Sequence, residues 1–153
     1  MLMVVVIGVL VLVTGGTAAG VLFSVALSVV PAFVALAPDR YVEMHKLIGR
    51  RYDRVMPPMV AIAVAADVVL AVSTGSAASR VLFAFAALLG AGVMAVSQFG
   101  NVPINRQVKN LAPGAVPAGW QDPRSRWRAL NLTRTSFAVL GLAVNACALV
   151  AAR

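Results

Sequence analysis

The sequence predicts an all-α membrane protein, a bundle of four transmembrane helices with an interfacial helix between the first and the second. Hydrophobic residues make up 61% of the 153 residues and charged residues only 12%, whereas soluble domains carry about a quarter charged residues. A helix that crosses a bilayer needs about 20 predominantly apolar residues. Four segments of this kind fill most of a single predicted domain, 1–153; they cover approximately residues 3–36, 56–72, 81–99 and 130–152.

The first segment is longer than one membrane crossing requires. Its roughly 34 residues would rise about 50 Å as a helix, against a hydrocarbon core of about 30 Å. Pro31 lies near its end, and proline removes an amide donor and crowds the preceding turn. We therefore expect a bend or a break at Pro31.

The polar stretch that follows predicts the interfacial helix. Pro38 and Asp39 suit a helix start, and apolar residues then recur at helical spacing up to Ile48, as in helices that lie in the headgroup layer. The second transmembrane helix is expected to begin at Met56, because Pro57 and Pro58 are tolerated in a first helical turn. A short turn then leads to the third helix, and Pro and Gly residues in 107–119 predict a loop before the fourth.

The net charge of +8 is better explained by topology than by binding to nucleic acid. Most of the Lys and Arg residues lie in the two long connections, between the first and second helices and between the third and fourth. Positively charged loops stay in the cytoplasm, so both termini are expected outside a plasma or inner membrane. Membrane lipids are then the expected surroundings of these basic residues.

Asp67 is an acidic residue in the middle of the second apolar segment. A charged carboxylate at that depth is costly, and intramembrane acids are candidates for function. One interpretation is a catalytic base or a proton-handling group. The other is a neutral side chain that forms a hydrogen bond with Asn145, which lies at a comparable depth in the fourth helix.

The strongest candidate site is the stretch from Gln98 to Arg106, where the third apolar segment ends. Asn101 and Asn105 are four residues apart, so they share one face if the helix continues past Pro103. The alternative is a helix that simply ends, with Gly100 and Asn101 as its stop signal. On the functional interpretation the asparagines donate hydrogen bonds and Arg106 stabilises an anion.

A second group of polar residues lies where the fourth helix begins. Trp127, Asn131 and Arg134 are spaced by four and three residues and therefore share a helical face. If the third and fourth helices are neighbours there, these residues join Asn101, Asn105 and Arg106 in one cluster. We predict that this cluster forms the mouth of a pocket.

His45 is the only histidine in the chain, and with Asp67 it is one of two candidate bases. As metal ligands, His45 and Glu43 are two residues apart and lie on different faces of a helix. A metal site made of His45 with Glu43 or Asp53 therefore requires an irregular backbone or a ligand from another segment. A copper or iron site is therefore an alternative to the cofactor-free site that we expect. The sequence contains no glycine pattern for dinucleotides, no P-loop and no cysteine cluster.

These motifs together resemble the anthrone oxygenase-like integral membrane family, also called domain of unknown function 1772. The specific elements are Asn-Val-Pro-Ile-Asn at 101–105 and Trp127 followed by Asn131 and Arg134. Val30-Pro31-Ala32 and the connection from Met44 to Pro57 also resemble the family.

The resemblance implies a four-helix membrane protein, some of whose relatives oxidise anthrones to anthraquinones with O2. It implies a flat, apolar aromatic substrate and a pocket that contains Asn101, Asn105, Trp127, Asn131 and Arg134. For such a reaction we expect Gln98, Trp127 and Asn131 to bind the substrate, and Asn101, Asn105, Arg106 and Arg134 to stabilise its anion. His45 or Asp67 would remove the proton. The competing hypothesis is a non-catalytic membrane transporter or scaffold, in which Asp67 handles a proton and the arginines bind anions or headgroups. Either function is compatible with a homo-oligomer.

Overall fold

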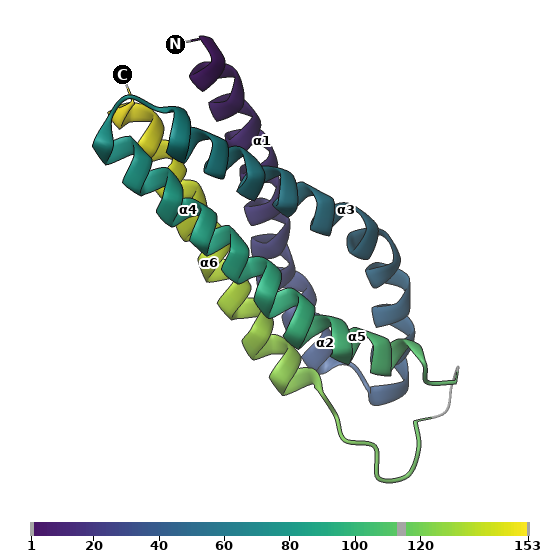
Figure 1. Cartoon of the computed structure of the whole chain (residues 1–153). Helices are drawn as coiled ribbons and strands as arrows, with labels where there is room; N and C mark the ends of the chain where they lie inside the picture. The colour runs from purple at the N-terminus through teal and green to yellow at the C-terminus, as the bar shows by residue number, and fades with distance from the viewer. Residues whose placement is uncertain (1, 113–115, 153) are drawn as a thin grey trace.

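In the computed structural model, which describes residues 2–112 and 116–152, the chain is helical and contains no strand within those residues. Four helical segments are long and apolar enough to cross a membrane, as predicted: Leu2–Ala35, Pro38–Ser73, Ala77–Lys109 and Arg124–Ala151. They lie side by side, with both chain ends at one end of the bundle and the long loop at the other (Figure 1). The fold class predicted from the sequence is therefore confirmed.

The first membrane helix bends without breaking at Pro31. It consists of α1 (Leu2–Ser24), a π-helical turn η1 (Val25–Val29) and α2 (Val30–Ala35). In the π turn the Val30 amide donates to the carbonyl of Val25, five residues back. This wider turn accommodates the proline ring, which would collide with a carbonyl of a regular helix.

The interfacial helix is not confirmed as a separate element. Residues 39–54 form the first half of one long helix, α3 (Pro38–Ser73), with Pro57 and Pro58 in its interior. Tyr41, Val42 and His45 of that half are buried in the bundle, whereas Met44 and Leu47 are exposed. The prolines bend the helix, which curves in its middle in Figure 1.

The third membrane helix also extends past its predicted end at Phe99. It comprises α4 (Ala77–Val96), a second π turn η2 (Ser97–Asn101) and α5 (Val102–Lys109). Gly100 and Asn101 are therefore inside a helix, and Pro103 follows a π turn as Pro31 does. The predicted loop at 107–119 begins after Lys109, and its residues 113–115 lie outside the described part of the chain.

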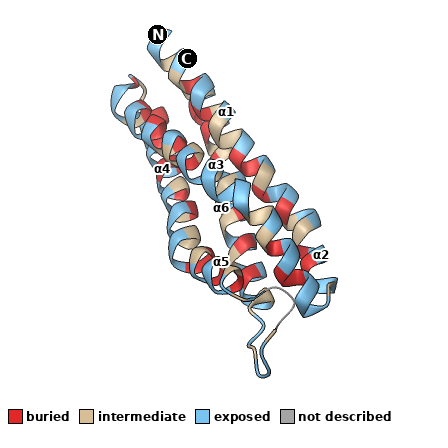
Figure 2. Cartoon of the chain, turned by 90° about the vertical axis from the view of Figure 1, so that its right-hand side faces the viewer, coloured by how far each residue is buried: buried red, intermediate tan, exposed pale blue. Residues whose placement is uncertain are grey.

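The last helix, α6 (Arg124–Ala151), begins six residues before the predicted start at Leu130. It packs chiefly against α4 and α1. Figure 2 shows buried residues on the sides of the helices that face one another and exposed residues on the outward sides. Many of the outward residues are large and apolar, such as Val5, Val72 and Leu88, as expected where lipid replaces water.

Arg124 joins the start of α6 to the end of α2. Its Nη1 donates to the carbonyls of Phe33 (2.9 Å) and Leu36 (2.6 Å), which have no partner within the ending helix. The guanidinium also lies over the ring of Tyr41, 5.3 Å from its centroid. Asp122 pairs with Arg124, and the hydrogen bond from Arg124 lowers the pKa of the Asp122 carboxyl.

We expect Arg124→Met to destabilise the folded protein by about 1–3 kcal/mol, because carbonyls at the end of α2 lose their donor in a partly buried place. Thermal unfolding in detergent micelles measures the change. Arg126→Met is the matched control, since Arg126 is exposed on the same helix. Equal unfolding temperatures for the two variants would contradict the capping role.

Candidate functional site

A cavity of about 410 Å³ lies at the loop end of the bundle. Cavities of this size hold small-molecule ligands. Its wall is mostly apolar and includes Leu22, Ile48, Met56, Val60 and Val93. Both π turns contribute to the wall, with Val25 and Val29 from η1 and Ser97, Gln98 and Asn101 from η2. Turns of this kind are frequent at functional sites.

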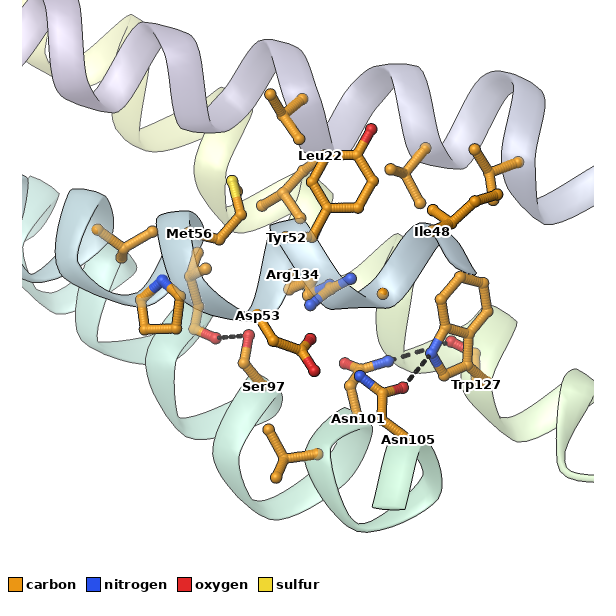
Figure 3. A pocket seen from close by; sticks show the side chains of 18 of the residues that line it. Leu22, Ile48, Tyr52, Asp53, Met56, Ser97, Asn101, Asn105, Trp127 and Arg134 are labelled. Atoms are coloured by element: carbon orange, nitrogen blue, oxygen red, sulfur yellow. Dashed lines mark hydrogen bonds between the residues drawn. The ribbon is translucent and has the colours of Figure 1, made fainter. Parts of the chain in front are cut away.

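Asn105 occupies the central polar position of the cavity. Its Oδ1 is 3.1 Å from Trp127 Nε1 and 3.1 Å from His45 Nε2. An indole nitrogen can only donate, so the Asn105 atom that contacts Trp127 Nε1 must be the oxygen. Because this oxygen can only accept, His45 Nε2 must also carry a proton and donate it to Asn105. The Nδ2 end of the amide is left for the cavity, where Figure 3 shows it on the side away from Trp127.

His45 is held in a cage of aromatic rings. The imidazole is 4% exposed, and its centroid lies 5.4 Å from Tyr41, 5.5 Å from Phe33 and 5.7 Å from Trp127. Its Nδ1 is buried and has no hydrogen-bond partner among the described residues. This cage could not be predicted from the sequence, because Phe33 and Tyr41 are ordinary residues of apolar helical faces.

Asn101 and Asn105 share a helical face, as the spacing predicted, and both line the cavity. Asn101 is 1% exposed, and its Nδ2 is 3.5 Å from the backbone carbonyl of Trp127. Gln98 lines the same wall one turn earlier. The helix therefore continues past Pro103, and the interpretation of Asn101 as part of a stop signal is wrong.

Arg134 brings a positive charge to the cavity. Its Nε and Nη2 donate to Asn131 Oδ1 over 3.2 and 2.8 Å, and Asn131 is fully buried behind it. No carboxylate lies within 4.0 Å of the guanidinium in residues 2–112 and 116–152. Asn131 thus fixes the orientation of Arg134 without neutralising its charge.

Asp53 is a cavity residue that the sequence did not single out as catalytic. Its carboxylate points into the cavity between Arg134 and Asn105 (Figure 3). Asp53 Oδ2 accepts a hydrogen bond from Lys109 Nζ at the end of α5. No local pattern could have revealed this pair, because its members are 56 residues apart.

Four predicted site residues do not line the cavity, and the first of them is Asn131, which is predicted to bind the substrate but is fully buried. Arg106 is exposed and does not line the cavity. Glu43 forms an exposed ion pair with Arg40 (3.1 Å), away from His45. Asp67 faces a separate cavity of about 40 Å³.

The predicted contact of Asp67 with Asn145 is confirmed, with Asn145 Nδ2 3.3 Å from Asp67 Oδ2. Asp67 is only 3% exposed. The two possible metal ligands, His45 and Glu43, are not brought together. Among the described residues, no three His, Cys, Asp or Glu side chains gather in a group that could hold a metal ion.

The fold and the cavity define a four-helix membrane protein with a mostly apolar cavity near one end of the bundle. Residues 44–144 match the family model described as anthrone oxygenase, about two thirds of the chain. The chain therefore belongs to the anthrone oxygenase family. No curated protein and no solved structure matches it. All the polar side chains that line the cavity fall inside the matched range.

Proposed function

We propose that this protein oxidises a flat, apolar aromatic ketone of the anthrone type with O2 inside the cavity. The observation that carries the proposal is the pair of donors in a mostly apolar cavity, Asn105 Nδ2 and the guanidinium of Arg134, which has no carboxylate within 4.0 Å among the described residues. A site of this composition suits a substrate that is apolar when it binds and becomes an anion when it reacts. The name of the family supports the same reaction class.

The chemistry needs little more than a proton acceptor and anion stabilisation. The methylene group of an anthrone is acidic because the resulting anion is delocalised over the fused rings and onto the ketone oxygen. Preorganised donors aimed at that oxygen lower the barrier, since they need no reorganisation as the charge develops. Asn105 and Arg134 are such donors, and their orientations are set by His45, Trp127 and Asn131.

The reaction balances without an external reductant. A base removes one methylene proton, and the carbanion gives its electron pair to O2 as a carbon–oxygen bond forms. The bound peroxide takes up a proton, then its O–O bond breaks as the second methylene hydrogen leaves as a proton. One oxygen atom remains as the new ketone, and the other leaves as water.

The remaining cavity residues bind and orient the substrate. Trp127 and Phe33 offer ring faces for stacking with their centroids 5.6 Å apart, and Gln98 and Asn101 add polar contacts at the η2 wall. We assign His45 as a positioning residue, because its Nε2 holds the Asn105 oxygen. The basic residues near this end of the bundle support a cytoplasmic location for the cavity.

The test is oxygen uptake and quinone formation by the purified protein in micelles with anthrone as substrate. The wild type is expected to exceed the spontaneous oxidation in protein-free micelles. Met94→Trp should lower turnover about tenfold or more, since its indole enters the cavity from a half-exposed wall position. Leu88→Trp is the matched control, on the same helix but facing outward. Uptake by the wild type equal to that of empty micelles would contradict the proposal and favour a non-catalytic role.

A further inference from the structure

The proposed reaction requires a proton acceptor beside the donors, and few cavity residues qualify. Among the described residues that line the cavity, the ionisable side chains are those of His45, Tyr52, Asp53 and Arg134. We propose that Asp53 is the general base that removes the methylene proton, an inference that rests on the proposed function. Asp53 is the one carboxylate in this lining set.

His45 is poorly placed to remove the methylene proton while it donates a hydrogen bond to Asn105. Its Nε2 carries a proton that is donated to Asn105, and its Nδ1 is the nitrogen with the free lone pair. That Nδ1 is buried without surface toward the cavity. To take a proton from the substrate, the ring would have to leave Asn105 and disturb the donor that it positions.

One carboxylate oxygen of Asp53 accepts a hydrogen bond, and the other has no hydrogen-bond partner among the described residues. Oδ2 accepts the hydrogen bond from Lys109, whereas Oδ1 accepts none from the described residues and belongs to a carboxylate that points into the cavity (Figure 3). Lys109 reaches Asp53 by passing over Gly49, where an added Cβ would lie 3.3 Å from Lys109 Cε. A carboxylate with one oxygen in a hydrogen bond and the other oxygen free is suited to act as a base.

The geometry supplies the complete proton-transfer step. Oδ1 takes the proton as the C–H bond breaks, and the electron pair of that bond moves into the rings toward the ketone oxygen. Arg134 and Asn105, on either side of Asp53 in Figure 3, stabilise the anion there. The Asp53 side chain is 43% exposed, so its proton can afterwards pass to water.

The experiment separates proton removal from oxygen chemistry. Purified protein in micelles is incubated without oxygen with anthrone deuterated at the methylene carbon, and deuterium loss to solvent is followed by mass spectrometry. The wild type is expected to accelerate exchange over protein-free micelles, and Asp53→Asn to lower the accelerated rate about 100-fold. Asp53→Glu should recover part of the rate.

Two further variants distinguish a base from a structural ion pair. Lys109→Met removes the ion pair with Asp53 but leaves the Asp53 carboxylate. Its rate of deuterium exchange should stay within about tenfold of the wild-type rate. Asp39→Asn removes an exposed carboxylate at the start of the same helix and should change nothing. Quenching of tryptophan fluorescence by anthraquinone should be retained in Asp53→Asn, which shows that its cavity is intact.

The possible failures are distinguishable. If the wild type consumes oxygen with anthrone and Asp53→Asn exchanges deuterium as fast as the wild type, the base assignment is overturned and the proposed function stands. Equal losses in Asp53→Asn and Lys109→Met would also overturn it, because the ion pair alone would then matter. If the wild type accelerates neither exchange nor oxygen uptake, both proposals fall together.

Discussion

An Asn105→Asp variant is expected to fold as the wild type does and to lose turnover about 10²–10³-fold. A carboxylate has the shape of the carboxamide and accepts hydrogen bonds at both oxygens, so Trp127 and His45 keep their partner. The substitution replaces Nδ2, a donor aimed at the cavity, with an oxygen that carries negative charge. The substrate anion then meets repulsion where it had a hydrogen bond.

Turnover with anthrone and the unfolding temperature are measured on the same preparation. Gln107→Glu is the matched control, because it makes the same change of charge on the exposed face of the same helix. A normal rate for Asn105→Asp would show that Nδ2 contributes nothing to the reaction. A large loss of stability would show instead that the two hydrogen bonds to the side-chain oxygen had not survived.

The second large effect is expected for Arg134→Met, with the turnover rate about 10²–10³-fold lower and KM nearly unchanged. The guanidinium interacts with charge that exists mainly in the transition state, so its removal lowers the rate more than it weakens ground-state binding. Stability should change little. The variant loses the hydrogen bonds from Arg134 to Asn131, which lowers the stability of the folded protein. This loss is offset because the folded protein no longer has to bury the charge of the guanidinium.

Steady-state kinetics of Arg134→Met, Arg134→Lys and Arg128→Met test this expectation. Lysine keeps the charge without the two-pronged contact to Asn131 and should restore part of the rate. Arg128 is exposed on the same helix, and its substitution should have no effect. An increase in KM alone would assign Arg134 to ground-state binding and not to anion stabilisation.

Much of this architecture could be predicted because it depends on periodicity within single helices. Four apolar segments predicted four membrane helices, and spacings of three and four residues placed Asn101 with Asn105, and Trp127 with Asn131 and Arg134. The contact of Asp67 with Asn145 followed from their similar depth in the second and fourth membrane helices. For the residues that share one helix, the relation follows from the rise and pitch of that helix.

The features that could not be predicted depend on contacts between distant parts of the chain. The first half of α3 has the amphipathic pattern of an interfacial helix, but it continues into the membrane helix, and its His45 packs against Phe33 and Trp127. Arg106 follows Asn105 directly yet is exposed, whereas Asp53 lines the cavity and pairs with Lys109, 56 residues away. Residue type alone does not tell which charged side chains enter the cavity and which are exposed.

Because of the two π turns, the direction in which each cavity side chain points depends on the number of residues that precede it in its helix. Each π turn contains one residue more than the α-helical turn that it replaces. One residue corresponds to about 100° of rotation around the axis of a regular helix. Deleting Ser28 from η1 would therefore turn Phe33 away from His45. A deletion in η2 ahead of Asn101 would likewise rotate both asparagines out of the wall. Single-residue deletions here are thus expected to harm activity more than most substitutions at the same positions.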